Sequence, residues 1–362
     1  MISSFRQPLV LFFFICLYQF SFSQNDPKQE AYDMGITAIQ EMEAGNIEKA
    51  ISILEECKAL DPDNPNYPYE IAYAHYLKKD YKTVTKILEK LIKNYEANDR
   101  MLQMLGNAYD MLGKPSKAIK TYEEGLELFP NSGLLFLERG NMEMINKEYN
   151  AALSYYERGI LAEPAFPSNY FWAAKIYMGS NQEVYGLIYG EIFMNLERGS
   201  KRTEEISERL FNTYKSQITF ESDTSIAVSF CQQSEINITL DELKALKLPF
   251  CLLFETTFSI ALAEAQEIDL ESLYTARDNF LTNYQTGKFK ENYPMALYNY
   301  QQKVKEAGHF EAYNYWLLGK GDTLTSEVWF DVQREKFNAF LNWYQENPME
   351  IDLKNFDHSS KL

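Results

Sequence analysis

The chain has 362 residues, and its 52 acidic and 35 basic side chains give a formal net charge of -17. This charge argues against a general nucleic-acid or anionic-membrane surface, because both need clustered cations. Hydrophobic residues make up 46% of the sequence, which is too high for a disordered chain. With 3 histidines and 4 cysteines, little material is left for a histidine or thiolate metal site. We therefore expect a folded, acidic protein without a bound metal or cofactor.

The first residues have the pattern of a secretory signal sequence. Arg6 is followed by the uninterrupted apolar run 9–18, and Ser21 and Ser23 place small residues before a cut. We predict cleavage near Ser23, which removes residues 1–23 and exports the protein to the periplasm or the medium. The alternative is an uncleaved anchor. The run is shorter than the roughly 20 residues of a membrane span, and no transmembrane segment is expected in the mature chain.

Cysteine usage fits export only loosely. Removal of Cys16 leaves Cys57, Cys231 and Cys251, an odd number that cannot form a complete disulfide framework. Cys57 is expected in a helical core. Cys231 and Cys251 could pair, but we expect two buried thiols.

A 34-residue step organises residues 28–198. The turn prolines at 62, 130 and 164 are separated by this step or by twice its length. Small or β-branched residues recur at the same step in two series: Ala38, Ala72, Gly106, Gly140 and Ala174, and Ala50, Val84, Ala118 and Ala152. Two helices approach closely where one side chain is small, so each unit is predicted to be a helix, a turn and a second helix. The turns are expected at residues 44–46, 79–80, 112–114 and 146–147.

This pattern resembles the tetratricopeptide repeat. The clearest unit, residues 100–131, matches the family at Leu105, Gly106, Tyr109, Gly113, Ala118, Tyr122 and Pro130. The resemblance implies an all-α fold, an α-solenoid in which helical hairpins form a right-handed superhelix. The repeats are then expected over 31–64, 65–98, 99–132, 133–166 and, in degenerate form, 167–200. In overall style the chain is similar to secreted or periplasmic repeat proteins of Bacteroidetes-type bacteria.

The second half, residues 201–362, loses the repeat register but is predicted to remain helical. Helices are expected over 203–217, 250–266, 268–284, 294–307 and 326–346, with another that begins at Asp241 after the cap Thr239. The Thr- and Ile-rich stretch 218–230 is predicted to form a small β-hairpin. We expect degenerate hairpins that stack on the repeats and cap them.

The sequence offers little catalytic chemistry. It contains neither a phosphate-binding glycine-rich loop nor a G-x-S-x-G elbow, and His75, His309 and His358 are scattered. We therefore predict no enzymatic activity and assign no catalytic residues. The basic run 198–202 is expected to be a solvated loop or a helix start; the alternative is a contact point for an acidic partner.

In the family that the chain resembles, the first helices of successive units line a concave groove. By alignment that face carries Tyr32, Tyr69, Tyr73, Tyr76, Gln103, Asn107, Asp110, Leu137, Asn141, Met144, Phe171 and Met178. Asn107 and Asn141 occupy equivalent places, and an amide can hold the backbone of an extended peptide. Family members that clamp a terminal carboxylate use Lys or Arg where this chain has Gln103 and Leu137, so an apolar or aromatic peptide is expected instead. Alternatively, Tyr73 and Tyr76 fill gaps between helices.

These inferences predict an exported adaptor that binds a peptide or protein partner in this groove, in a periplasmic or envelope assembly. Two alternatives from other classes remain open. One is a glycan-binding protein that uses exposed Tyr and Trp side chains. The other is a hydrolase with an unrecognised site in residues 201–362.

Overall fold

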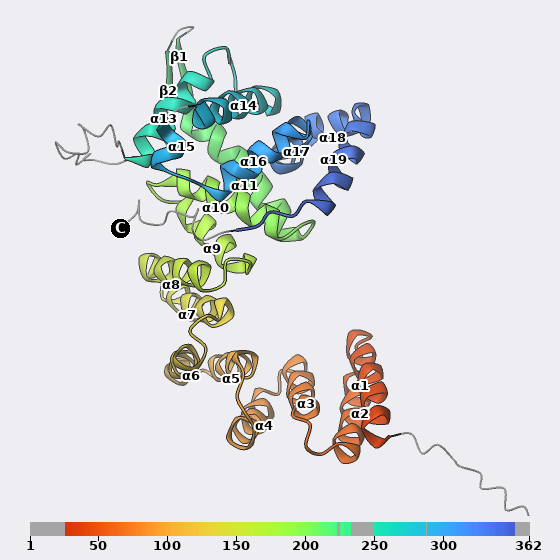
Figure 1. Cartoon of the computed structure of the whole chain (residues 1–362). Helices are drawn as coiled ribbons and strands as arrows, with labels where there is room; N and C mark the ends of the chain where they lie inside the picture. Colours follow the sequence, from red (N-terminus) through yellow and green to blue (C-terminus); the bar gives the residue numbers. More distant parts are fainter. Residues whose placement is uncertain (1–25, 223–224, 233–248, 287, 352–362) are drawn as a thin grey trace, which may run out of the picture. The chain divides into compact units, whose positions relative to one another are not determined.

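The computed structural model describes residues 26–222, 225–232, 249–286 and 288–351. The predicted signal sequence and the helix expected from Asp241 lie outside these residues. The chain divides between Tyr95 and Glu96 into two compact units, which are described separately below (Figure 1).

The first unit consists of two helical hairpins. Its helices are α1 (Pro27–Glu43), α2 (Ile47–Leu60), α3 (Asn66–Leu77) and α4 (Tyr81–Asn94). α1 begins at Asp26, whose carboxylate accepts the backbone N–H of Lys28, and Pro27 fits the first turn because its missing N–H is not needed there. The small residues Ala38 and Ala50 are fully buried, so the helices of the hairpin pack closely.

The second unit opens with three further hairpins of the same kind. They comprise α5 (Asp99–Met111), α6 (Pro115–Leu128), α7 (Gly133–Ile145), α8 (Tyr149–Ala162), α9 (Pro167–Tyr177) and α10 (Glu183–Leu196). A Cβ atom on Gly106 would lie 2.2 Å from the Tyr122 ring, and one on Gly140 would lie 2.4 Å from the Tyr156 ring. Each tyrosine ring therefore rests directly on the glycine backbone of the preceding helix. This close approach is the physical reason why small residues recur at the 34-residue step.

The turns inside four of the five hairpins, two in each unit, share one geometry. Gly45, Lys79, Gly113 and Lys147 have positive φ values of 84°, 61°, 70° and 62°, at steps of one repeat. In each turn the next residue's N–H bonds the carbonyl five positions earlier, as in Asn46 to Glu41 (2.8 Å) and Lys114 to Tyr109 (2.9 Å). This is the Schellman motif, which satisfies the free carbonyls at a helix C-terminus. The predicted turn positions are confirmed.

Beyond the repeats the second unit continues with mainly helical elements. They are α11 (Lys201–Gln217), β1 (Ile218–Ser222), β2 (Ser225–Val228), α13 (Phe250–Ala261), α14 (Leu270–Thr286), α15 (Lys288–Asn292), α16 (Ala296–Glu306), α17 (Phe310–Leu318), the 3-10 turn η1 (Gly319–Gly321), α18 (Thr323–Val332) and α19 (Arg334–Glu346). β1 and β2 pair antiparallel, with Ile218 opposite Val228, so the predicted hairpin is confirmed. The single helix expected over 326–346 is wrong, because the backbone leaves helical geometry at Gln333 and separates α18 from α19. The all-α class with one small hairpin holds.

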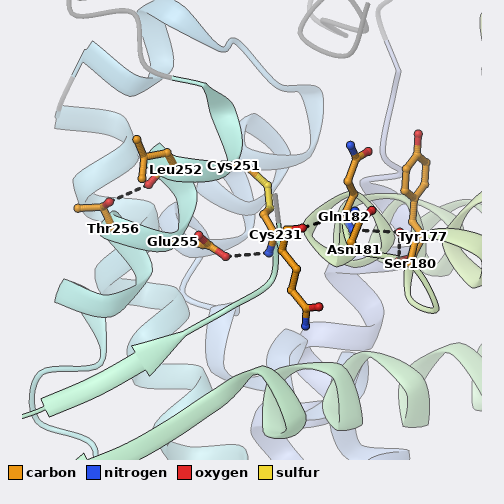
Figure 2. Close-up of a disulfide and its surroundings, with 10 residues drawn as sticks. Tyr177, Ser180, Asn181, Gln182, Cys231, Cys251, Leu252, Glu255 and Thr256 are labelled. Atoms are coloured by element: carbon orange, nitrogen blue, oxygen red, sulfur yellow. Dashed lines mark hydrogen bonds between the residues drawn. A yellow bond between two sulfur atoms is a disulfide. The ribbon is translucent and has the colours of Figure 1, made fainter. Parts of the chain in front are cut away.

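The expectation of two buried thiols at Cys231 and Cys251 is also wrong, because the two cysteines form a disulfide (Figure 2). Cys231 follows β2 and Cys251 lies in the first turn of α13, with their Cα atoms 6.1 Å apart. The Cys231 N–H also donates to Glu255 Oε1 at 2.8 Å. Gln232 N–H bonds the Asn181 carbonyl at 3.0 Å, which attaches this segment to the loop before α10. The cysteines are 20 residues apart, and sequence spacing alone does not show that α13 returns to β2.

A buried ion pair lies at the centre of the second unit. Arg277 Nη2 of α14 donates to Glu191 Oε1 of α10 at 2.8 Å, and both residues are at most 4% exposed. Burial opposes the charged guanidinium, but Glu191 outweighs it and raises the pKa of Arg277 above its usual value. The same Glu191 oxygen accepts Gln301 Nε2 of α16 at 2.6 Å and Tyr313 OH of α17 at 2.7 Å.

The other two nitrogens of Arg277 also donate hydrogen bonds. Its Nε donates to Asn314 Oδ1 at 2.5 Å and its Nη1 to Tyr214 OH of α11 at 3.0 Å. The network therefore joins α10, α11, α14, α16 and α17 through one carboxylate and one guanidinium. We call it the Glu191–Arg277 network.

We predict that Arg277→Met lowers the free energy of unfolding of the second unit by about 3–5 kcal/mol, because it leaves the Glu191 carboxylate buried without a cation. Urea unfolding followed by circular dichroism measures the change. The double variant Glu191→Gln/Arg277→Met recovers part of the loss, since the stranded charge is removed.

The matched control for this prediction is Arg209→Met, which breaks the exposed pair between Arg209 and Glu205 on α11. That pair is expected to contribute less than about 1 kcal/mol. Equal losses for Arg277→Met and Arg209→Met would contradict a central role for the buried pair.

Candidate functional site: the face of the first helices

The first helices of the first unit expose apolar side chains to solvent. On α1 these are Tyr32 (60% exposed), Ile36 (43%) and Ile39 (42%), and on α3 they are Tyr73 (40%) and Leu77 (43%). Their spacing of three and four residues places each set along one side of its helix. A Cβ atom on Gly35 would lie 3.4 Å from the Tyr67 ring, so α1 and α3 are neighbours. We call these two sets the apolar stripes of α1 and α3.

The other predicted tyrosines of α3 are less available. Tyr69 and Tyr76 are half-buried. The Tyr76 ring lies edge-on to Tyr81 at 5.2 Å between centroids, so it packs against the start of α4. Tyr76 therefore fills a gap between helices, whereas Tyr73 extends into solvent.

In the second unit, one carboxylate connects three of the predicted side chains. Glu138 Oε1 of α7 accepts Gln103 Nε2 at 2.6 Å and Asn107 Nδ2 at 3.1 Å, both from α5. Its Oε2 accepts Asn141 Nδ2 at 3.1 Å. An amide nitrogen carries two N–H groups, so one N–H on each amide is left for another acceptor.

The sequence analysis missed Glu138. The signal that could have found it is its position three residues before Asn141, on the same side of α7. Because Asn107 and Asn141 are equivalent in adjacent repeats, a carboxylate between them can reach both.

The oxygen atoms of the two asparagines are also in use. Tyr122 OH donates to Asn107 Oδ1, and Tyr156 OH donates to Asn141 Oδ1 at 3.0 Å. These are the same tyrosines whose rings rest on Gly106 and Gly140. Each asparagine therefore links the two helices of its own hairpin and also lies on the first-helix face.

The remaining predicted residues differ in exposure. Asp110 is half-buried, and Leu137 and Met144 are half-buried against the core of the second unit. Phe171 is only 4% exposed and packs against Phe193 at 5.2 Å between ring centroids, so it belongs to the core. Met178 packs on Gly186 and Gly190 of α10.

The basic run 198–202 is largely engaged within the protein. Arg198 Nη1 donates to the Tyr344 carbonyl at 2.7 Å, and its guanidinium lies 3.6 Å from the centroid of the Tyr344 ring. Arg202 pairs with Glu197 and donates to Ser168 Oγ at 3.0 Å. The two arginines therefore hold α9, α11 and α19 around the end of α10. The run is a helix start, as one of the expected readings had it, because α11 begins at Lys201 after the cap Ser200, but its arginines are bonded within the protein and do not form a free cationic patch.

Two kinds of site are absent from the described residues, a metal-ligand cluster and a membrane-spanning helix. Within these ranges there is no group of three or more His, Cys, Asp or Glu side chains placed to hold a metal ion. No helix in the described part of the chain combines the length and apolarity needed to cross a membrane. Burial raises the pKa of Glu183 to about 7, and its Oε2 is buried without a hydrogen-bond partner among the described residues.

Comparison with known families agrees with this architecture. Residues 100–132, which comprise α5, α6 and the turn between them, match the family model of the tetratricopeptide repeat. These residues form a tetratricopeptide repeat. A curated relative, tetratricopeptide repeat protein 21B of Homo sapiens, is 29% identical over 116 residues, or 32% of this chain. The aligned part spans 9% of the length of that relative.

Solved structures of tetratricopeptide repeat proteins are also similar to this chain. YrrB, whose structure is described as having an unusual peptide-binding site, is 18% identical, with a TM-score of 0.33 over 47% of this chain and 88% of its own. PilF of Pseudomonas aeruginosa is 19% identical, with a TM-score of 0.43 over 52% and 86%. TTC0263 of Thermus thermophilus is 14% identical, with a TM-score of 0.43 over 50% and 98%.

We predict that Asn107→Ala lowers the free energy of unfolding by about 1–3 kcal/mol, because the buried Tyr122 hydroxyl loses its acceptor. Thermal and urea unfolding measure the change. In a double-mutant cycle, Asn107→Ala combined with Tyr122→Phe costs less than the sum of the two single changes, since no hydroxyl is then stranded.

Asn150→Ala on the exposed side of α8 is the control and is expected to change stability by less than about 0.5 kcal/mol. A strictly additive cycle would contradict the coupling between Asn107 and Tyr122.

Proposed function

We propose that this protein is an exported scaffold that holds a peptide or protein partner against its first helices, in a periplasmic or envelope assembly. The observation that carries the proposal is the apolar stripes of α1 and α3, which leave Tyr32, Ile36, Ile39, Tyr73 and Leu77 in solvent. An exposed apolar helix face of this kind is typical of a surface that a partner covers, because burial removes the apolar side chains from water.

The chemistry of the stripes suits an apolar or aromatic partner. Tyrosine supplies a large apolar area with few rotatable bonds, which is why it is enriched among residues that dominate binding energy. Burial of apolar surface contributes about 25 cal/mol per Å² before the costs of association. In the second unit, the amides around Glu138 supply N–H donors that can bind the carbonyls of an extended chain.

Two features support an oxidising compartment. The Cys231–Cys251 disulfide persists where thiols are not kept reduced, as in the periplasm or outside the cell. The signal pattern of residues 1–23 points to the same destination. Cys57, the free cysteine among the described residues, is buried, and burial raises the pKa of its thiol, which keeps it unreactive.

The repeat architecture supports a scaffold rather than an enzyme. Tetratricopeptide repeat proteins are in general scaffolds, and function on such folds depends on the surface that each chain presents. The asparagines at 107 and 141 are poor test positions, because their replacement also disturbs the hairpins. The exposed tyrosines of the apolar stripes avoid this difficulty.

The partner is tested by cross-linking the purified protein in envelope extract from its native source and identifying what it retains by mass spectrometry. We expect Tyr32→Ser/Tyr73→Ser to reduce recovery of the principal partner about tenfold, equivalent to about 1.4 kcal/mol of binding energy. Circular dichroism checks that the variant keeps its fold.

Tyr149→Ser is the matched control for this test, since Tyr149 is 50% exposed but lies on α8, a second helix. Recovery is expected to be unchanged for Tyr149→Ser. Equal recovery with all three proteins would place the partner elsewhere and contradict the proposed face.

Export is tested by mass spectrometry of the protein isolated from its producing organism. We expect an N-terminus at Gln24, as well as a peptide containing Cys231 linked to Cys251 after alkylation without reduction. An intact Met1 together with alkylated thiols at both cysteines would contradict export.

A further inference from the structure

In the second unit, a surface formed by α11, η1 and α18 has the features of a binding site. It is separate from the amides around Glu138. A cavity of about 290 Å³ opens between these elements. Its walls include the aromatic side chains Trp316, Phe330 and Phe337 and the charged side chains Glu204, Lys320 and Glu327. This volume lies near the lower end of the range of small-molecule pockets, about 300 Å³, and suits one side chain or one small organic group.

The wall formed by η1 is held rigidly against α11. A Cβ atom on Gly321 would lie 2.2 Å from Phe211, so the turn rests directly on α11 at this residue. The Lys320 N–H donates to Ser207 Oγ at 3.1 Å. Ser326 Oγ donates to the Gly319 carbonyl at 2.9 Å and fixes the start of α18. The pocket is therefore formed by elements that pack directly on one another.

The charges around the pocket favour a cation. Lys320 Nζ pairs with Glu204 at 3.3 Å, which neutralises both side chains. Glu327 forms no hydrogen bond or ion pair with the described residues. One uncompensated negative charge beside three aromatic rings attracts an ammonium or guanidinium group, through the carboxylate and through the ring faces. The acidic charge of the whole chain acts in the same direction.

The helix that supplies Glu327 also exposes an aliphatic stripe. Leu324 is 80% exposed, Val328 65% and Val332 72%, at successive steps of four residues along α18. Ser326 is buried, and Trp329 and Phe330 pack against Tyr315 and Phe337, so these residues attach α18 to the protein while the aliphatic stripe stays exposed. An amphipathic helix with its aliphatic side in water is typical of a helix whose packing partner is another chain.

The charges of α18 indicate what kind of partner chain would pack on it. α18 contains no Lys or Arg between Thr323 and Val332, while Glu327 and Asp331 are acidic. Two identical α18 helices packed together would offer Glu327 no cation from the opposing helix, so the pattern opposes self-association through this surface. A helix with an aliphatic side and a flanking Arg or Lys complements both the stripe and the pocket.

We propose that α18 docks an amphipathic helix of a partner protein, with the aliphatic stripe covered by that helix and a basic side chain from it inserted beside Glu327. This surface uses none of the residues of the apolar stripes of α1 and α3. The two proposals therefore stand or fall separately.

The test uses fluorescence anisotropy with the purified protein and labelled synthetic helical peptides. Each peptide has about 15 residues, because shorter isolated helices are marginal in water. One peptide has a leucine face flanked by arginines, and the second has glutamate in place of each arginine. The arginine peptide is expected to bind at least about tenfold more tightly than the glutamate peptide.

Protein variants locate the bound peptide. We expect Glu327→Gln to weaken binding of the arginine peptide about tenfold, and Val328→Asp to weaken it by a similar factor. Both positions are on the surface, so the fold is expected to persist, and circular dichroism verifies this. Glu335→Gln on α19 is the matched control: it removes one exposed carboxylate outside the pocket and is expected to leave binding unchanged.

Four results would overturn the proposal. The first is no binding of the arginine peptide, or equal binding of both peptides. The second is an equal loss for Glu327→Gln and Glu335→Gln, which would indicate general attraction to an acidic surface. The third is binding of N-acetyl-arginine amide as tight as that of the arginine peptide, which would indicate a site for a free small cation. The fourth is a dimer in analytical ultracentrifugation that dissociates with Val328→Asp, which would make a second copy the occupant.

Discussion

The fold of the second unit depends on the ion pair between Glu191 and Arg277. Removing two charges from water is costly, and their attraction compensates for this cost only where the remaining donors and acceptors are also satisfied. Here Gln301 and Tyr313 bond to the carboxylate, and Asn314 and Tyr214 bond to the guanidinium. These bonds connect five helices through one carboxylate and one guanidinium. A second group of bonds, from Tyr344 to Asn195 and from Asn195 to Tyr313, connects α19 to the same centre.

This arrangement gives α10 a role that the earlier second helices do not have. In α6 and α8 a minority of residues are buried, whereas every residue of α10 from Val184 to Asn195 is buried. Gly186 and Gly190 admit Met178, and the opposite sides of the helix contact α9, α11 and α16. The fifth repeat departs from the family pattern because α10 packs on all its sides. Arg198 and Arg202 near the C-terminal end of α10 also hold this helix in place. At its N-terminal end, the segment after the disulfide does the same through the bond from Gln232 to Asn181.

The proposed binding residues of the second unit also stabilise the repeats. Asn107 and Asn141 bond to Tyr122 and Tyr156 within their own hairpins. Glu138 of α7 accepts from Asn107 of the preceding hairpin and from Asn141 on its own helix, so a partner at the proposed site would bind to groups that already hold the helices together. Such a surface is organised before binding, which reduces the entropy lost on association. The apolar stripes of α1 and α3 and the aliphatic stripe of α18 differ from it, because their side chains are exposed to solvent.

The sequence by itself determined the features that depend on local spacing. The 34-residue step fixed the hairpins, because a glycine under a tyrosine ring and a left-handed residue at each turn recur with the repeat. The β-hairpin was also predictable from its local composition. Only the tertiary structure decided the contacts between distant segments: Glu191 with Arg277, 86 residues apart, Asn195 with Tyr344, 149 apart, and the pairing of Cys231 with Cys251. No periodicity connects these residues, and their approach depends on how the non-repeated helices pack. The same holds for the functional surfaces, since burial separated Tyr73 from Tyr76 and Phe171, and only packing left Glu327 without a partner among the described residues.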